Sequence, residues 1–249
     1  MIYIPIILIG LSFGSFYNVV IYRLPIRKSI ISPRSFCPAC MESIPWHQNI
    51  PILSFILIKG KCTRCKNKIS TKYPLVELMT GMIWLWSFSQ YELKTAIFFV
   101  IITGILTIIG FIDLSHRIIP ISLIISGLLI LSIQVSLFPE ILSTSFWGAV
   151  TGFGYLGIVM LITKFFYKKE TMGWGDLLLI IILGAWIGPM NIGFTILLSA
   201  VSGLGYWFLM GLLTQFDREM EIPFGFFLSF SAIIVHTLDI NWKNLLSFP

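Results

Sequence analysis

The stretch GWGDLLLIIILGAWIG, residues 173–188, places an aspartate, Asp176, at the edge of a long apolar run. A second acid, Asp113, lies at the end of another apolar run, within the stretch IDLSHRIIP at residues 112–120. A carboxylate at the edge of a hydrocarbon layer loses hydration that it cannot easily replace, so an acid at that depth is a candidate for function. Two such acids on one side of a membrane predict an aspartic protease.

The amino-acid composition indicates that most of the protein surface faces lipid and not water. Hydrophobic residues make up 57% of the chain and charged residues 11%, and the mean hydropathy is +0.92, which leaves too little polar surface for a water-soluble globule. Apolar runs of about 17 to 25 residues, long enough for a helix to cross the hydrocarbon core, recur along the chain. The predicted spans are residues 2–22, 73–90, 95–112, 118–138, 141–167, 176–190, 192–213 and 222–240. We therefore expect an all-α polytopic membrane protein with about eight transmembrane helices.

The sixth predicted span is the shortest, because Gly188 and Pro189 interrupt the apolar pattern before the seventh. The spans also organise the chain. Residues 1–22 form the first transmembrane helix, residues 23–72 form a cytoplasmic loop domain, and residues 73–249 form a seven-helix membrane domain that carries both aspartates.

The basic residues predict the orientation, because short loops rich in Lys and Arg stay in the cytoplasm. The loop at residues 23–72 holds ten of the seventeen basic residues. With eight crossings, fifteen fall on this face and only Lys94 and Lys243 on the other. Both chain termini therefore lie outside, and both aspartates lie at the cytoplasmic boundary. This topology and contact with anionic lipid account for the net charge of +6, so no nucleic-acid partner is expected.

Asp113 and Asp176 are separated by 62 residues, so only the packing of helices can bring them together. Two carboxyl groups a few ångströms apart cannot both ionise cheaply, and such a pair holds one shared proton near neutral pH. The ionised acid would take a proton from water while the other polarises the scissile carbonyl. The helix dipole favours the charge on Asp176, at a helix start, and the proton on Asp113, at a helix end.

The glycines beside Asp176 have two interpretations. Gly173 and Gly175 lack a Cβ, which lets a substrate backbone approach closely or lets the chain adopt a positive φ. The plain alternative for both acids is solvation at the headgroup level, with Asp176 as a simple N-terminal cap.

All four cysteines of the chain fall in two C-x-x-C pairs, CPAC at residues 37–40 and CTRC at residues 62–65. Each pair can donate two thiolates from one tight turn, and together they complete the tetrahedral four-thiolate site that zinc prefers. The reducing cytoplasm disfavours disulfides. With no position open for water, the metal would be structural and would hold a loop that is too polar to bury much core. The predicted ligands are Cys37, Cys40, Cys62 and Cys65.

Three further features lie in or beside this loop. Residues 50–58 are apolar but too few to cross the membrane, so we expect them to lie on the bilayer or to pack under the cysteine pairs. His47 is not needed as a zinc ligand and is predicted at the surface. Glu77, four residues into the second span, is either favoured in the first turn by the helix dipole or functional.

The chain resembles the type IV prepilin peptidase family over nearly its whole length. Beside the aspartate and cysteine motifs, the resemblance rests on GSFYNVVIYRLP (14–25), IPWHQNIPILS (44–54), ISTKYPLVELMTG (69–81) and IPFGFFLSF (222–230), in this order. It implies a GxGD-type aspartic protease of the bacterial cytoplasmic (inner) membrane. Such enzymes remove the basic leader of type IV prepilins, or of the pseudopilins of type II secretion or competence systems, after a glycine on the cytoplasmic side.

The same resemblance assigns roles to residues. It implies that Asp113 and Asp176 are catalytic, that Gly173 and Gly175 support the catalytic loop, and that the four cysteines bind zinc. Many members also methylate the new N-terminus with S-adenosylmethionine, and Glu77 is a candidate methyltransferase or substrate contact. Two positions depart from the family pattern: Leu178 replaces a usual Lys, and Ile121 replaces a residue that is often polar. We expect altered activity or substrate choice at these positions, with cleavage retained.

Two alternatives come from other classes. A different GxGD intramembrane protease would explain the acids but not the cysteine loop. A transporter or scaffold would use the acids to bind cations, but transporters usually show broken helices in paired halves, and the sequence shows no internal repeat. Neither the particular pilin nor the oligomeric state follows from the sequence.

Overall fold

The computed structural model describes residues 3–168, 172–213 and 221–238. These residues are helical outside the loop at 24–71 and short connections, and within these ranges the only β-pairing is two isolated bridges. The predicted all-α class is confirmed. The chain forms two compact units, Met1–Gly104 and Ile105–Pro249. Lys243 and the outer ends of the first and last predicted spans, Ile2 and Ile240, lie outside the described residues.

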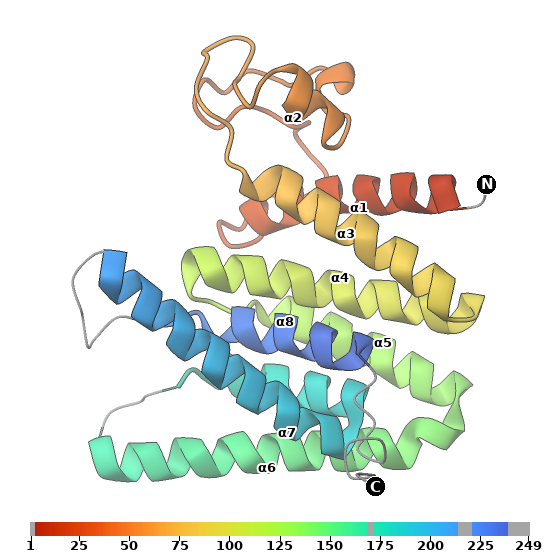
Figure 1. Cartoon of the computed structure of the whole chain (residues 1–249), viewed down its shortest axis with the longest axis vertical. Helices are drawn as coiled ribbons and strands as arrows, with labels where there is room; N and C mark the ends of the chain where they lie inside the picture. Colours follow the sequence, from red (N-terminus) through yellow and green to blue (C-terminus); the bar gives the residue numbers. More distant parts are fainter. Residues whose placement is uncertain (1–2, 169–171, 214–220, 239–249) are drawn as a thin grey trace, which may run out of the picture. The chain divides into compact units, whose positions relative to one another are not determined.

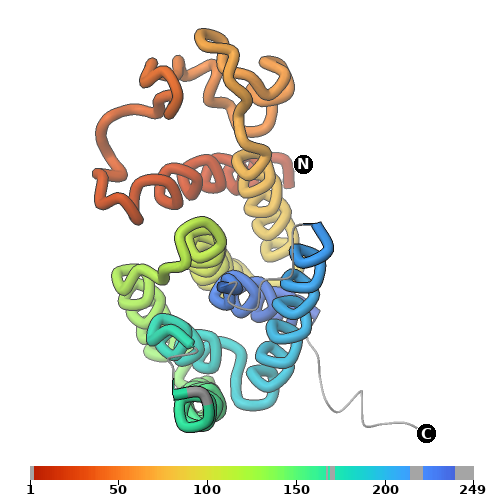
Figure 2. Tube along the Cα trace, turned by 90° about the vertical axis from the view of Figure 1, so that its left-hand side faces the viewer, coloured from red at the N-terminus to blue at the C-terminus, as the bar shows by residue number. Residues whose placement is uncertain are grey.

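The first unit is built on two long helices, α1 (Tyr3–Arg23) and α3 (Lys72–Gln90), which pack against each other (Figure 2). Gly14 permits the close approach, because a Cβ there would lie 2.6 Å from the Glu77 Cα. Phe13 and Trp84 stack across the same contact with ring centroids 4.8 Å apart. The loop between these helices contains a short 3-10 helix, η1 (Trp46–Gln48), and the five-residue α2 (Leu53–Leu57), and it lies at the end where α1 stops and α3 begins (Figure 1).

The remaining elements follow α3 in order. They are α4 (Leu93–His116), which crosses the boundary between the units, α5 (Ile121–Leu137), η2 (Pro139–Ile141), α6 (Leu142–Tyr167), α7 (Trp174–Leu213) and α8 (Phe224–Thr237). Helix α7 is the centre of the second unit, because it contacts α5, α6 and α8. Its fully buried residues, such as Leu179, Ile180 and Leu183, therefore supply much of the apolar core.

Helix α7 contains a sharp break (Figure 1). Gly188 adopts φ 81°, in the left-handed region that favours glycine, and Pro189 follows it inside the helix. Proline lacks the N–H that an uninterrupted helix needs and its ring clashes with the preceding turn. The predicted interruption between the sixth and seventh spans is confirmed, and the two halves of α7 correspond to those spans.

The helices match the predicted membrane segments. The eight spans correspond to α1, α3, α4, α5, α6, the two halves of α7, and α8. Among the described residues, four helical segments are long and apolar enough by themselves to cross a membrane: Tyr3–Arg23, Leu93–His116, Pro139–Phe166 and Trp174–Leu213. Helices α5 and α8 are shorter and apolar. The chain is therefore a polytopic membrane protein, and the domain boundaries near residues 22 and 72 stay a prediction.

Candidate active site and metal centre

Asp113 lies in the last turn of α4 and is only 6% exposed. Its Oδ2 accepts a hydrogen bond of 3.0 Å from the backbone N–H of Phe226, in the first turn of α8. The first N–H groups of a helix have no partner within the helix and are free to bind an anion. This hydrogen bond joins the end of α4 to the beginning of α8, between two residues that are 113 positions apart in the chain.

Asp176 lies in the first turn of α7 and is half-buried. Its backbone N–H donates to the carbonyl of Gly173 over 3.1 Å, which fixes the start of the helix. Ile119 lies against Gly175, the neighbour of Asp176, and against Gly225, whose Cβ position is 3.2 Å from Asp113 Oδ2, so the second unit brings the two acid-bearing helix ends together around one side chain. Their meeting agrees with the expectation from the sequence, and their catalytic role stays a prediction.

The connection between α4 and α5 closes the space around the two acids. Ile119 lies against two glycines: a Cβ on Gly175 would be 3.0 Å from the Ile119 Cβ, and a Cβ on Gly225 would be 2.9 Å from its Cδ1. The same added atom on Gly225 would lie 3.2 Å from Asp113 Oδ2. The two distances from the Gly225 position are tighter than ordinary van der Waals contact, so a side chain at Gly225 would disturb Asp113 directly.

The backbone angles rule out one of the two roles considered for the glycines of the GWGD motif. Among the described glycines, positive φ values occur at Gly60 and Gly188, so a positive φ at Gly173 or Gly175 is wrong. Close approach of a substrate backbone stays a prediction, and the structure shows that the Ile119 side chain already lies against Gly175. At Gly173 a Cβ would meet Asp176 Oδ2 at 3.5 Å, which is ordinary contact.

Arg117 completes the end of α4. It adopts φ 57°, and its backbone N–H donates to the Asp113 carbonyl over 2.9 Å. Its guanidinium also reaches the carbonyls of Asp113 and Leu114, at 3.5 and 3.4 Å. A cation here satisfies the last carbonyls of the helix and places positive charge beside the acid.

The two departures from the family pattern lie on exposed side chains. Leu178 is 37% exposed and Ile121 is 64% exposed. Neither residue fills the core around Asp113, so the substitutions leave the packing of the two acids intact.

The four cysteines come together in the first unit. The sulfurs of Cys37, Cys40, Cys62 and Cys65 all lie within 4.8 Å of one another, and those of Cys37 and Cys65 are 3.9 Å apart. A tetrahedral zinc with bonds of about 2.3 Å places its sulfurs roughly 3.8 Å apart. The donor set therefore fits a structural zinc ion, and the predicted convergence of the cysteines is confirmed.

Each of the two cysteine pairs lies in its own turn, and the two turns have the same backbone geometry. In the first, an isolated bridge joins Phe36 to Ser43, and the Cys37 N–H donates to the Glu42 carbonyl over 2.9 Å. The residue after the pair, Met41, has φ 59°. A left-handed residue directly after the second cysteine reverses the chain and lets both thiols point the same way.

The second turn repeats this geometry around CTRC. A bridge joins Lys61 to Lys68, the Cys62 N–H donates to the Asn67 carbonyl over 2.9 Å, and Lys66 has φ 61°. Backbone hydrogen bonds from Cys65 and Arg64 lower the pKa of the Cys62 thiol to about 7. The thiolate is the form that binds metal, so the turn prepares this sulfur as a ligand.

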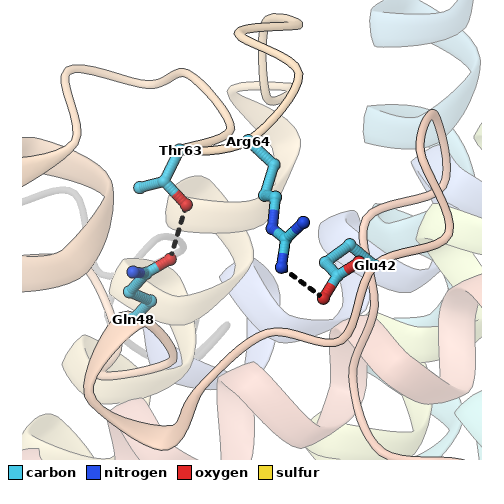
Figure 3. Close-up of polar contacts among 4 residues, drawn as sticks. All are labelled: Glu42, Gln48, Thr63 and Arg64. Carbon is cyan, nitrogen blue, oxygen red and sulfur yellow. Dashed lines mark hydrogen bonds and ion pairs between the residues drawn. The ribbon is translucent and has the colours of Figure 1, made fainter.

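Polar contacts join the second cysteine turn to the rest of the loop (Figure 3). The Arg64 guanidinium pairs with Glu42 at 3.2 Å, and the Thr63 hydroxyl donates to the Gln48 side-chain oxygen over 3.0 Å. His47 is outside the metal-competent cluster of the described residues, and its carbonyl accepts a hydrogen bond from the Ser54 hydroxyl. His47 is exposed, which confirms its predicted position at the surface.

Arg23, the last residue of α1, anchors the first part of the loop. It is 4% exposed, and its guanidinium donates to the carbonyls of Ser29, Pro33 and Arg34 at 3.0, 2.8 and 3.2 Å. The guanidinium also lies 5.6 Å from the centre of the Phe36 ring, next to the first cysteine. A planar group with five donors suits this task, because one side chain can hold several carbonyls at once.

Glu77 has a different position from the one expected. The first turn of α3 contains no acid, so stabilisation of Glu77 by a first-turn helix dipole is wrong. Its Oε2 instead accepts a hydrogen bond of 2.7 Å from the backbone N–H of Ile52, which adopts φ 59°. The carboxylate is buried and holds the loop against α3 in a strained conformation.

The apolar segment at residues 50–58 has two faces. Ile50, Ile52, Phe55 and Ile58 line a cavity of about 720 Å³ in the first unit, which Glu77 also lines. Three neighbours in α2 point outwards and are at least half exposed: Leu53, Ile56 and Leu57. The first face therefore turns towards the cavity that Cys37 and Cys62 also line, and packing under the cysteine pairs and contact of the second face with the bilayer both stay predictions.

Sequence reasoning assigned no role to Gly225, Phe226 or Ile119. The sequence did contain a signal for these residues, because they lie in two stretches on which the family resemblance rests. Gly225 and Phe226 belong to IPFGFFLSF, and Ile119 belongs to IDLSHRIIP. What the sequence lacked was the pairing between them, which only the packing of α8 against the end of α4 supplies.

Comparisons with known proteins show the family to which the chain belongs. Residues 8–91 match the model of the bacterial peptidase A24 N-terminal domain, and residues 100–208 match the type IV leader peptidase family. The prepilin leader peptidase/N-methyltransferase of Stutzerimonas stutzeri is 35% identical over 91% of this chain and 87% of its own length. The corresponding protein of Myxococcus xanthus is 34% identical over 83% of this chain and 62% of its own length.

A third relative is the type 4 prepilin-like proteins leader peptide-processing enzyme of Escherichia coli O78:H11. It is 33% identical over 90% of this chain and 89% of its own length. No solved structure matches the chain.

Proposed function

Because this chain belongs to the type IV leader peptidase family, we propose that it is a membrane aspartic endopeptidase. It removes the basic leader of type IV prepilins or type II secretion pseudopilins after a glycine. The observation that carries the proposal is the meeting of the helix ends that bear Asp113 and Asp176 around Ile119 within one unit. Family membership favours this function over a transporter or scaffold, and the match to the A24 N-terminal domain favours it over other GxGD proteases.

In this mechanism the two acids divide the work. One carboxylate takes a proton from a water molecule, and the water oxygen attacks the scissile carbonyl carbon. The other acid, protonated, donates to the carbonyl oxygen, and a proton then passes to the leaving amine as the C–N bond breaks. No covalent intermediate with the enzyme forms.

The hydrogen bonds assign the base. The Phe226 N–H donates to Asp113 Oδ2, and the positive Arg117 lies nearby, so both neighbours favour the ionised form of Asp113 over the protonated one. This opposes the assignment from helix dipoles alone, which gave the proton to Asp113. We therefore assign Asp113 as the base that activates water and Asp176 as the proton donor.

The membrane supports the positioning of the substrate. A prepilin is an apolar helix with a basic leader, so it diffuses in the bilayer and presents its cleavage point at a fixed depth. Confinement to two dimensions supplies part of the alignment that catalysis requires. The distribution of Lys and Arg supports a cytoplasmic location for both acids and the cysteine loop, in the bacterial inner membrane.

The second proposed activity is N-methylation of the new terminus with S-adenosylmethionine. The names of the relatives, which include N-methyltransferase, support it. Zinc would be held by Cys37, Cys40, Cys62 and Cys65, and when bound it supplies a structural cross-link with no open position. The cysteine turns orient their thiols and their backbone donors prepare Cys62, so this chain's own residues form the site.

Co-expression with a prepilin tests the peptidase. We expect the wild-type protein to shorten the prepilin by its leader on a gel, and Asp113→Ala and Asp176→Ala to leave it full length. Glu140→Gln is the matched control, because it changes an exposed acid in the same unit. Normal cleavage by either aspartate variant would remove the proposed dyad.

A further inference from the structure

The cavity in the first unit lies between the loop and the ends of α1 and α3. It measures about 720 Å³, within the range of roughly 300–1,000 Å³ typical of small-molecule sites. Its walls come from α1, from both cysteine turns, from α2 and from α3. A space of this size, bounded on several sides by distant segments, is a candidate binding site that the peptidase mechanism does not use.

The floor of the cavity is polar and buried. Glu77 and Asn18 both line it and are each 8% exposed. The Asn18 amide donates to the Tyr73 carbonyl over 3.0 Å, and the Ser15 hydroxyl is hydrogen-bonded to the Glu77 carboxylate. The Ile52 N–H already donates to Glu77 Oε2, and the negative charge that the carboxylate keeps would attract a ligand that carries a positive charge.

The walls are aromatic. Tyr22, Phe36, Phe55 and Tyr73 all line the cavity, on four different segments of the chain. Aromatic faces bind flat heterocyclic rings by stacking and attract cations through the ring quadrupole. Together with the acidic floor, this lining suits a ligand that combines a planar base with a positive centre.

The rim depends on the cysteine turns. Cys37 and Cys62 line the cavity, and so do both partners of the pairs Glu42–Arg64 and Gln48–Thr63 (Figure 3). A zinc ion held by the four cysteines would therefore also hold part of the cavity wall. It would support ligand binding in this way without direct contact between metal and ligand.

We propose that this cavity binds S-adenosylmethionine, with the Glu77 carboxylate facing the sulfonium charge and the aromatic walls holding the adenine. The proposal rests on the methyltransferase activity proposed above. The alternative occupant, the N-terminal amine of a cleaved pilin, also carries a positive charge, but its single terminal residue would leave most of this volume empty.

The transfer itself balances without a further reactant. The pilin amine first loses a proton to water, and its lone pair then attacks the methyl carbon of the sulfonium. The carbon–sulfur bond breaks with its electron pair going to sulfur, which becomes a neutral thioether. The methylated ammonium then loses a proton to solvent.

Binding of S-adenosylmethionine to the full-length, zinc-loaded protein in detergent tests the site, measured by titration calorimetry. Val19→Trp fills the cavity from α1, where Val19 lines it, and Leu8→Trp adds the same ring to an exposed position of α1 outside the cavity. Glu77→Gln removes the charge but keeps an oxygen that can accept the Ile52 N–H. Zinc content of the same preparations reports whether the first unit of each variant is folded, and leader cleavage reports the state of the second unit.

We expect the wild type and Leu8→Trp to bind equally, Glu77→Gln to bind roughly tenfold to hundredfold more weakly, and Val19→Trp to show no binding. All four should cleave the leader normally. If Val19→Trp and Glu77→Gln both bound S-adenosylmethionine with wild-type affinity, the proposed binding site would be wrong, but the proposed methyltransferase activity would stand. Unchanged donor binding with lost methylation would assign the cavity to the pilin amine instead. A wild type that cleaves but neither binds the donor nor methylates would overturn the methyltransferase proposal, and this site with it.

Discussion

The aspartate region and the cysteine region reach their geometry by different means. Asp113 and Asp176 lie at the ends of long helices, and the contacts that position them come from apolar packing and from the Phe226 N–H. The cysteines lie in a loop with two isolated bridges and one five-residue helix. Helix packing and one backbone hydrogen bond therefore position Asp113, whereas a metal ion bound by the four cysteines would cross-link the turns of the loop. The difference implies that each region can be disabled without the other.

The largest expected effect comes from breaking the aspartate region. Asp176→Asn keeps the size of the side chain but removes the proton donor, so we expect leader cleavage to slow by at least about 100-fold. Zinc content and S-adenosylmethionine affinity should not change, because the cysteine cluster and the cavity belong to the other unit. Single-turnover cleavage of a purified prepilin and metal analysis of the same sample measure both. Loss of zinc together with cleavage would show that the regions are not independent.

The converse change breaks the cysteine region. Cys37 is the buried member of the cluster, and its replacement in Cys37→Ser leaves three thiolates, so we expect zinc content to fall from about one ion per chain to near zero. The loop should become sensitive to protease and methyl transfer should be lost, while the leader is still removed.

Mass spectrometry of the pilin product distinguishes these activities, because a cleaved pilin without the added methyl group has its own mass. Ser12→Ala, a change of an exposed residue in α1, is the control. A Cys37→Ser protein that retained stoichiometric zinc would contradict the assignment of the ligands.

Gly225→Ala sharpens the account of the aspartate region. The added methyl group would lie 3.2 Å from Asp113 Oδ2 and 2.9 Å from Ile119, so the acid must shift. Misplacement of a catalytic group by about 1 Å costs on the order of 100-fold, and we expect kcat for cleavage to fall roughly 10- to 100-fold with little change in KM. Gly193→Ala is the control, because nothing lies within 4 Å of its Cβ position. Equal kcat values for the two variants would mean that the contact has no catalytic consequence.

The smallest effect is expected at the rim of the cavity. The Glu42–Arg64 pair is 3.2 Å long, but its side chains are 43% and 70% exposed. Exposed ion pairs contribute little, so Glu42→Gln should change the free energy of unfolding by less than about 1 kcal/mol. Thermal unfolding of the zinc-loaded protein measures this. A change as large as that of Cys37→Ser would mean that the loop depends on this pair and not on the metal.

The sequence predicted those features that depend on local pattern. Apolar runs predicted the helices, Pro189 predicted the break in α7, and the C-x-x-C spacing predicted the thiol cluster. These succeed because a helix, a kink and a tight turn are each determined within a few residues.

The contacts that the sequence did not predict join residues far apart in the chain. The Phe226 N–H reaches Asp113 only because α8 begins beside the end of α4. Glu77 accepts the Ile52 N–H only because the loop folds back onto α3. Glu77 therefore lines a cavity and does not lie in the first turn of the helix, where the helix dipole would stabilise it. The identity of a residue does not show which backbone N–H groups or side chains will lie near it. The protonation state assigned to Asp113 therefore changed once the structure showed its neighbours.

An experimental structure of the protein in lipid with an uncleaved prepilin bound tests the central claim most directly. We expect the scissile bond to lie between Asp113 and Asp176, with a carboxyl oxygen of each acid within about 2.6–3.2 Å of the carbonyl oxygen or of a bridging water. The Phe226 N–H should still donate to Asp113. A scissile bond held away from both acids, or acids that open onto opposite faces of the membrane, would contradict the account.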